Sequence, residues 1–396
     1  MKTTRRNFLK AGALLSLAAS ALRLLLRSAL AAQPGKDETI LVVLQLSGGN
    51  DGLNTVIPFA DDLYHQSRPT LRQVAAQAHR LNDQLAFHPR MGGFAKLFAE
   101  GQLVVVQGVG CEKSDRNHPG AMHAWHTAEP QPPGPQTGWL GRAADVLWNP
   151  ETANLPAAFV GAIPQPFASN AERVIVPSLH SPRDLVCAPQ EKLSDSSNSA
   201  LLDYARRTTA CAHATSARLE GVLKSGASDY PQFRLADELR TIAQLIRADA
   251  GIRIYFTELG GGGIGGFDNH AGQLGNHCSL LEQLSASITA FARDLQRDKL
   301  FDRVVLMTFS EFGRTLHENG RRGTGHGAAQ PVFIVGGRVQ GGLVGAHPSL
   351  AELDADAQKP HTDFRRVYAT LLDRWLGLDS RAILGDAFAP VPILRA

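Results

Sequence analysis

Five residues whose side chains commonly bind metal ions lie next to apolar, strand-like runs of the sequence. They are Asp51, Asp268, His270, Glu311 and His326. Carboxylate oxygens and imidazole nitrogens together suit a zinc-like divalent ion. Because open α/β sheets place ligand-binding residues at the carboxyl ends of their strands, this pattern predicts a metal site along one edge of a sheet.

Each of these residues also has a second interpretation, which the sequence leaves open. Asp51 follows two glycines and could cap the next turn instead of binding an ion. Asp268 and His270 form an Asp-x-His pair, which is a weak signal by itself. His326 stands between two glycines that would let its imidazole approach an ion, but it also fits a polar loop. Arg314 could bind a substrate anion or form a surface ion pair.

The elements that would position these residues alternate between strands and helices. Apolar runs of strand length suit buried central strands of a parallel sheet, and they occupy 39–46, 103–109, 252–257, 304–309 and 331–335. Helical spacing of apolar residues extends over 232–250 and 271–300, whereas 112–138, 178–198 and 260–266 have loop composition. The alternation predicts a three-layer α/β/α sandwich with a mostly parallel central sheet, forming a single domain over residues 36–396.

The first residues predict export. Residues 4–10 carry a twin-arginine motif, followed by an apolar stretch and a small-residue stop at 29–31. Arg23 and Arg27 interrupt the apolar stretch, and a spanning helix needs roughly 20 apolar residues. We therefore predict a signal peptide at residues 1–32, with an uncleaved anchor as the alternative. The expected location is periplasmic or extracellular, the twin-arginine translocase is the expected partner during export, and no stable membrane span is expected.

Composition excludes some classes of protein. The chain has 40 basic and 37 acidic residues, too even a balance to predict a nucleic-acid partner. Its four cysteines are far apart and form no CxxC pair, which favours buried thiols over a zinc knuckle; they are Cys111, Cys187, Cys211 and Cys278. The glycine-rich run 260–266 lacks the following acidic residue of a dinucleotide-binding fold, which argues against an oxidoreductase.

Several segments together resemble an exported bacterial family catalogued as domain of unknown function 1501. These are the twin arginines 5–6, Leu-Ser-Gly-Gly-Asn-Asp-Gly-Leu-Asn at 46–54, Gly-Phe-Asp-Asn-His at 266–270, Phe-Ser-Glu-Phe-Gly-Arg-Thr at 309–315, and paired glycines at 336–337 and 341–342. That family resembles a branch of the alkaline phosphatase and sulfatase superfamily. The resemblance implies an alkaline phosphatase-like fold with two divalent metal ions, one held by Asp268, His270 and His326 and the other by Asp51 and Glu311.

The chain departs from the family pattern at two positions. Gly325 stands where the family usually has an aspartate. Asn117 stands where the family usually has a serine, at the place of a hydroxyl nucleophile. An asparagine cannot carry a transferred phosphoryl or sulfuryl group. Ser114 is a nearby hydroxyl, although its use would require a shift of register.

Other polar residues near these segments have more than one interpretation. His118, His123 and His126 could bind an ion or a substrate anion, or could simply be solvated. Near the C-terminus, Asp363 resembles the N-cap of the closing helix of that superfamily, and His361 is its neighbour.

Two classes of function remain open at this point. The first is an exported, metal-dependent hydrolase of phosphate or sulfate esters, in which Arg314 or Asn117 would clamp the anion of a small ester or glycan substrate. The second is a non-catalytic binding or scaffold protein of the cell envelope that keeps the fold. Metal content separates the two, since two bound ions favour catalysis and none favours the scaffold.

Overall fold

The computed structural model describes most of the chain beyond its first segment. The described residues are 38–73, 75–112, 115–131, 134–149, 155–185, 220–221, 229–261 and 266–395. The predicted signal peptide, Ser114, Cys187 and Cys211 lie outside them. Within these ranges, no helix is both long enough and apolar enough to cross a lipid bilayer.

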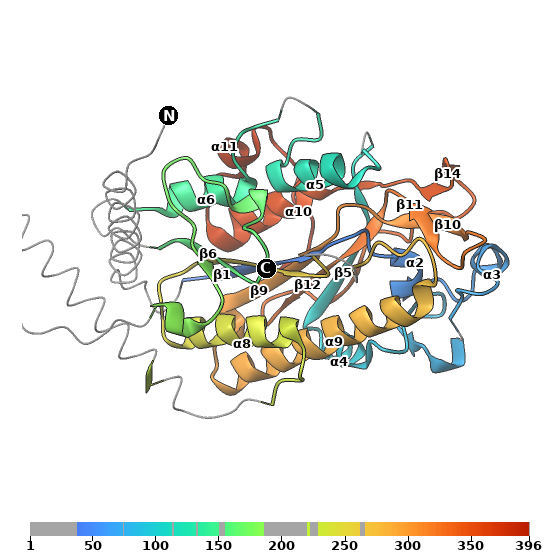
Figure 1. Ribbon diagram of the computed structural model, residues 1–396, viewed down its shortest axis with the longest axis horizontal. Helices are drawn as coiled ribbons and strands as arrows, with labels where there is room; N and C mark the ends of the chain where they lie inside the picture. The colour runs from blue at the N-terminus through green and yellow to red at the C-terminus, as the bar shows by residue number, and fades with distance from the viewer. Residues whose placement is uncertain are drawn as a thin grey trace, which may run out of the picture.

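A large central sheet runs through the molecule (Figure 1), and it has nine strands in the described part of the chain. Its order is β13-β5-β12-β9-β1-β8-β6-β7, with β16 also paired to β5. The strands are β1 (Ile40–Leu46), β5 (Leu103–Gly110), β6 (Ala157–Val160), β7 (Ser178–Leu179), β8 (Ile254–Leu259), β9 (Val304–Phe309), β12 (Gln330–Gly336), β13 (Gly342–Val344) and β16 (Thr362–Asp363).

One strand runs against all the others in this sheet. β12 is antiparallel to both β5 and β9, whereas all other pairs are parallel. The mostly parallel sheet is confirmed, but the expectation that 331–335 is a parallel strand is wrong. A run that is apolar on both faces indicates burial and carries no information about direction. The reversal brings the start of β12 to the edge where the parallel strands end.

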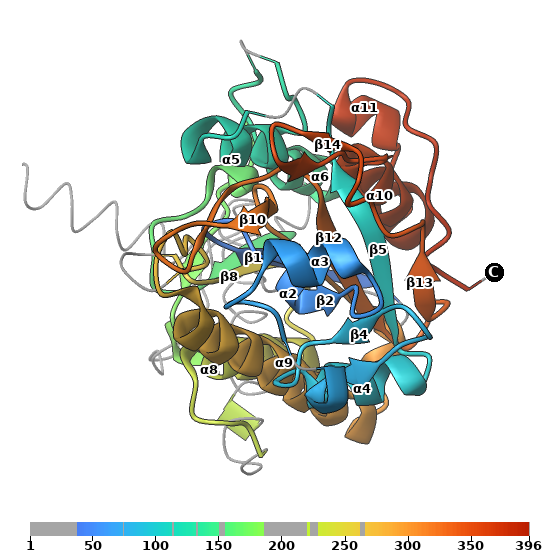
Figure 2. The same cartoon turned by 90° about the vertical axis from the view of Figure 1, so that its right-hand side faces the viewer.

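Helices cover both faces of the sheet, which confirms the three-layer sandwich (Figures 1 and 2). One layer contains α4 (Gly92–Ala99), α8 (Arg234–Arg247) and α9 (Gln273–Arg297). The other contains α5 (His118–Thr127), α6 (Trp139–Leu147), α10 (Phe364–Thr370), the π-helical turn η5 (Leu371–Leu376) and α11 (Ser380–Leu384). Alternate residues of β1 enter the two cores, with Val42 and Leu44 on the first side and Leu41 and Val43 on the second.

Smaller elements gather beyond the carboxyl edge, nearest the viewer in Figure 2. One small sheet has the order β11-β10-β15-β14 and the other the order β2-β4-β3. Their strands are β10 (Arg314–Glu318), β11 (Thr324–His326), β14 (Leu353–Asp354), β15 (Ala357–Gln358), β2 (Val56–Ile57), β3 (His79–Arg80) and β4 (Ala86–Phe87). The short helices in this region are α2 (Gly52–Thr55) and α3 (Asp62–Ser67). The 3-10 turns are distributed along the described chain, with η4 (Phe301–Arg303) leading into the start of β9; the others are η1 (Ala75–Gln77), η2 (Phe167–Ser169) and η3 (Pro182–Leu185).

The expected loop over 112–138 is wrong in its middle, because α5 lies there. Pro119 occupies the first turn of this helix, where a proline costs no hydrogen bond. Ala121, Ala124 and Trp125 are buried, so packing against the sheet stabilises a helix that its composition does not suggest. The segment 178–198 begins with β7 and η3, and its remainder lies outside the described residues.

Candidate metal centre

Three side chains from different elements converge at the carboxyl edge of the sheet. Asp268 lies in the loop between β8 and α9, His326 ends β11, and His118 begins α5. One ligand atom from each lies within 4.8 Å of those of the other two. Oδ1 of Asp268 is 3.4 Å from Nε2 of His118 and 3.3 Å from Nε2 of His326. The reversed direction of β12 explains why His326, which precedes a strand, shares this edge with residues that follow strands.

His118 and His326 each use one ring nitrogen, Nδ1, for a hydrogen bond that points away from the centre of the cluster. Nδ1 of His326 lies 2.6 Å from the carbonyl oxygen of Arg116, which can only accept a hydrogen bond. Nδ1 of His118 lies 2.8 Å from Oε1 of Glu311. Each Nδ1 must therefore carry a proton, so in a neutral ring Nε2 presents a lone pair to the centre of the cluster.

The centre of the cluster thus has electron-pair donors facing one another. Nε2 of His118 is buried and has no hydrogen-bond partner in the described part of the chain. A carboxylate oxygen and two imidazole nitrogens are the kinds of electron-pair donor that a divalent ion such as zinc binds. Two histidines and one carboxylate are also a common ligand set of catalytic zinc sites. The residues therefore fit a divalent metal ion, with Glu311 and the Arg116 carbonyl as outer partners that orient the ligands.

His270 joins the same cluster. Its Nε2 lies 2.9 Å from Oδ1 of Asp268 and 2.9 Å from Nε2 of His326. Burial lowers the pKa of His270, although Asp268 opposes this effect. The structure thus brings together the three residues that the sequence assigned to the first ion and adds His118 to them.

Glu311 lies behind His118 at the end of β9. Only 2% of its side chain is exposed, and it accepts hydrogen bonds from the backbone N–H of Gly48 and from the hydroxyl of Ser310. Its bond to His118 is the first cause of the raised pKa of that histidine, a shift that burial opposes. These contacts fix Glu311, which in turn holds the ring of His118.

Asp51 has a different environment. Its carboxylate is 2% exposed, and Oδ2 lies 2.6 Å from Nη1 of Arg68 and also accepts a hydrogen bond from Gln273. Although it stands at the N-cap of α2, its side chain makes no capping bond. Burial raises its pKa, but Arg68 and then His277 outweigh burial, so the pKa is lowered overall. Asp51 is therefore ionised beside a buried arginine.

Arg314 is buried, with 1% of its side chain exposed, so it is not in a surface ion pair. Its guanidinium donates to the carbonyl oxygens of Gly48, of Gly49 at 2.7 Å and of Phe267 at 3.0 Å, and to Oδ1 of Asp268 at 2.7 Å. It thereby connects the loop after β1 to the loop after β8. These bonds hold Asp268 in place. They also use the N–H groups of Arg314 that were expected to bind a substrate anion.

The other polar residues of α5 and its start have separate environments. Asn117 is exposed at the N-cap of the helix, and its Nδ2 lies 3.2 Å from Oδ1 of Asp115. His126 is buried against Gln45, and burial lowers its pKa to about 3. His123 packs against Phe167, with ring centroids 5.4 Å apart. Of these three histidines, only His118 enters the cluster.

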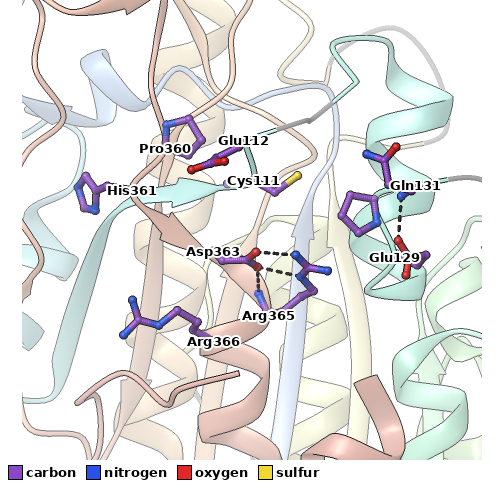
Figure 3. A pocket seen from close by; sticks show the side chains of 11 residues that line it. Cys111, Glu112, Glu129, Gln131, Pro360, His361, Asp363, Arg365 and Arg366 are labelled. Atoms are coloured by element: carbon purple, nitrogen blue, oxygen red, sulfur yellow. Dashed lines mark hydrogen bonds and ion pairs between the residues drawn. The ribbon is translucent and has the colours of Figure 1, made fainter. Parts of the chain in front are cut away.

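A cavity of about 380 Å³ lies beside the start of α10 (Figure 3). Asp363 accepts a hydrogen bond from the backbone N–H of Arg365, which confirms its prediction as the N-cap. His361 also lines this cavity, and its Nε2 is 2.8 Å from the carbonyl oxygen of Ala346. Cys111 is buried here, while Cys278 is half-buried. These residues do not belong to the candidate metal cluster.

Two residues near the site went unnoticed in the sequence. Gln273 begins α9 and donates to Asp51, and its place at the start of the helix after the Asp-x-His pair was the available signal. Arg68 follows α3 in a segment with no recognisable motif, so no local pattern indicated its role.

Comparisons with known proteins give distant structural likenesses. A protein in the alkaline phosphatase superfamily from Vibrio parahaemolyticus is 11% identical, with 92% of this chain and 78% of that chain covered and a TM-score of 0.39. The C-terminal periplasmic domain of EcEptC from Escherichia coli in complex with Zn is 10% identical, with 77% and 75% covered and a TM-score of 0.36. PsFucS1 sulfatase from Pseudoalteromonas sp. is 10% identical, with 88% and 68% covered and a TM-score of 0.37.

Likenesses at these TM-scores assign no reaction to the chain. No curated protein matches it. The sequence does match the family described as "Protein of unknown function (DUF1501)" over residues 38–388, which is most of its length. The chain therefore belongs to this family, as its motifs predicted.

Proposed function

We propose that this chain is an exported metal-dependent hydrolase of phosphate or sulfate esters. The observation that carries the proposal is the convergence of His118, Asp268 and His326, whose ligand atoms lie within 4.8 Å of one another while the Nδ1 atoms of both histidines are bound elsewhere. These side chains are also accessible, because 35% of His118, 44% of Asp268 and 23% of His326 is exposed. A substrate could therefore reach the cluster from solvent.

His118, Asp268 and His326 would hold the ion, with His270 beside them. When bound, a divalent ion supplies positive charge that polarises an ester oxygen and stabilises the leaving group. Glu311 fixes the ring of His118, and Arg314 fixes the carboxylate of Asp268. Both supporting residues are nearly fully buried, which suits a rigid site.

The attacking group in this proposal is a water molecule, because Asn117 occupies the place of the expected hydroxyl nucleophile. Asn117 is exposed and stands one residue before His118, so its amide could donate a hydrogen bond to a substrate anion. His270 is suited to accept a proton from the water, since burial lowers its pKa and favours its neutral form.

The alternative proposal is a non-catalytic binding or scaffold protein of the cell envelope. Two contacts favour it: the donors of Arg314 are bound to protein oxygens, and the amide of Asn117 is bound to Asp115. A bound glycan or secreted partner would then replace the ester substrate. The twin-arginine motif supports export in both proposals, with the translocase as a transient partner.

Elemental analysis of the purified mature protein, paired with a screen of aryl phosphate and aryl sulfate esters, tests the proposal. Bound metal with turnover that Asp268→Asn abolishes would support the hydrolase. Bound metal without turnover of either ester class would favour the binding protein. Protein that stays free of metal after incubation with zinc or manganese would contradict a metal-dependent reaction.

A further inference from the structure

We propose that the chain binds one divalent ion, and that the guanidinium of Arg68 takes the place of a second ion beside Asp51. The first ion rests on the proposed function and lies at the cluster of His118, Asp268 and His326. The second half departs from the expectation that Asp51 and Glu311 share an ion. It rests on contacts of Arg68 that are independent of any reaction.

Arg68 is built into the fold as an internal cation. None of its side chain is exposed. Its Nη1 lies 2.6 Å from Oδ2 of Asp51 and 2.9 Å from Oδ1 of Asn54. Its Nε donates to the carbonyl oxygen of Leu316 at 2.9 Å, and its Nη2 donates to that of Thr315 at 2.8 Å. A guanidinium with four such hydrogen bonds neutralises a buried carboxylate without a metal ion.

The two residues expected to share the second ion have separate partners. Oδ2 of Asp51 is taken by Arg68 and Gln273, while Oε1 of Glu311 is taken by His118 and the N–H of Gly48. Oδ1 of Asp51 has no hydrogen-bond partner among the described residues. Nevertheless, within these ranges the group of three or more His, Cys, Asp or Glu side chains able to hold a metal does not include Asp51.

The local charge also argues against a second ion. Asp51 carries one negative charge, and Arg68 balances it with one positive charge at 2.6 Å. Even with the Glu311 carboxylate as its second ligand, a divalent ion added here would leave one uncompensated positive charge in a site that is almost fully buried. Buried charges without partners are strongly unfavourable, so the Asp51 site does not fit a second ion.

Metal stoichiometry tests the proposal directly. Purified protein is incubated with excess ZnCl₂, passed over a desalting column, and analysed for zinc by mass spectrometry. We expect one zinc ion per chain. Two ions per chain would overturn the inference and leave the proposed function standing. Protein without bound zinc would contradict the proposed function. The ion pair of Arg68 with Asp51 would then be tested by the unfolding experiment below.

Two variants locate the ion. The double variant Asp51→Asn, Arg68→Gln keeps hydrogen-bonding groups at both positions and removes both charges, so we expect it to retain one zinc ion. Asp268→Asn should lose the ion. Loss of zinc from a double variant that keeps the wild-type circular dichroism spectrum would overturn the inference, since Asp51 would then be a ligand.

Unfolding in the presence of EDTA tests the internal cation without metal. Arg68→Gln should lower the melting temperature, and adding Asp51→Asn should restore much of the loss. The matched control is Arg240→Gln. Arg240 forms an ion pair of the same length, 2.6 Å, with Asp237, but the two side chains are 45% and 61% exposed. A loss for Arg68→Gln no larger than for this control would overturn the role of Arg68.

Discussion

Asp51 and Asp268 follow neighbouring strands of one sheet, yet they have opposite environments. β1 and β8 are paired in parallel, so both loops leave from the same edge. Each carboxylate has a buried arginine as partner, Arg68 at 2.6 Å and Arg314 at 2.7 Å. Asp51 is 2% exposed, whereas Asp268 is 44% exposed and faces three imidazole rings.

This difference shows that position at the carboxyl edge does not by itself define a ligand. A buried aspartate needs its charge balanced at all times, and Arg68 provides this from within the fold. An open aspartate beside imidazole rings can instead exchange with ions from solvent. The surroundings of each carboxylate thus separate a structural ion pair from a candidate metal site.

The largest expected effect is on metal binding by the open carboxylate. Loss of a residue that only orients a ligand lowers metal affinity by roughly 10–100-fold. We expect Asp268→Asn to lower zinc affinity by more than this, because it removes a charged ligand. Isothermal titration with ZnCl₂ measures this change. Asp294→Asn, at a buried carboxylate of α9 paired with Arg247, is the control and should bind zinc like the wild type. Equal affinity in Asp268→Asn would remove Asp268 from the site.

The second effect is on the stability of the buried pair. Arg68→Met leaves Asp51 buried without its cation, and breaking one side of such a pair costs about 3–5 kcal/mol. Urea unfolding in EDTA measures the free energy. Arg240→Met, on the exposed face of α8, should change it by about 0–1 kcal/mol. A small loss in Arg68→Met would mean that water, not Arg68, solvates Asp51.

The third effect is smaller and separates an outer partner from a ligand. Glu311→Gln keeps the shape of the side chain but weakens the hydrogen bond that fixes His118. We expect zinc affinity to fall by about 10–100-fold. A fall as complete as that in Asp268→Asn would identify Glu311 as a direct ligand and restore its original assignment.

The sequence was sufficient to predict the layers of the fold and part of the site. β1, β5 and β9 are apolar on both faces because helices cover both sides of the sheet, so their burial was visible in composition. Their positions near strands made Asp268, His270 and His326 candidate ligands, and the resemblance to the family implied that the three share one ion. The direction of β12 could not be predicted, because a fully buried strand has the same apolar pattern in either direction.

The contacts of Arg68 and His118 depend on the folded chain. Arg68 reaches carbonyl oxygens of β10 that lie almost 250 positions later in the sequence, and no local motif encodes such a contact. His118 enters the cluster because α5 packs on the sheet through Trp125 and its neighbours, in a segment whose composition suggested a loop. Tertiary packing determines both positions.

The smallest expected effect is a pH dependence that differs between the two regions. The bond from Glu311 raises the pKa of His118, and burial opposes it only in part. In metal-free protein, the charged form of His118 therefore stabilises the fold below its unfolded pKa of about 6.5, and this contribution is lost as pH rises through the higher folded pKa. Asp51 has a lowered pKa, so its charged form stabilises the fold at any pH above the ordinary pKa of an aspartate. This contribution to stability is lost only as the pH falls through the lowered pKa in acid.

Zinc and the proton compete for His118, so the pH effect on affinity has the opposite sign to its effect on metal-free stability. Below the folded pKa of His118, zinc affinity should weaken by up to about tenfold for each pH unit. Titrations between pH 6 and 8 measure this slope in the wild type and in Arg68→Gln, which leaves the cluster intact and should keep the same slope. In Glu311→Gln the weakening of zinc affinity should begin at a lower pH, because the raised pKa of His118 depends on the Glu311 carboxylate. If the slope in Glu311→Gln is not shifted, the proton that competes with zinc is on a group other than His118, and Glu311 does not set the pH dependence of zinc binding.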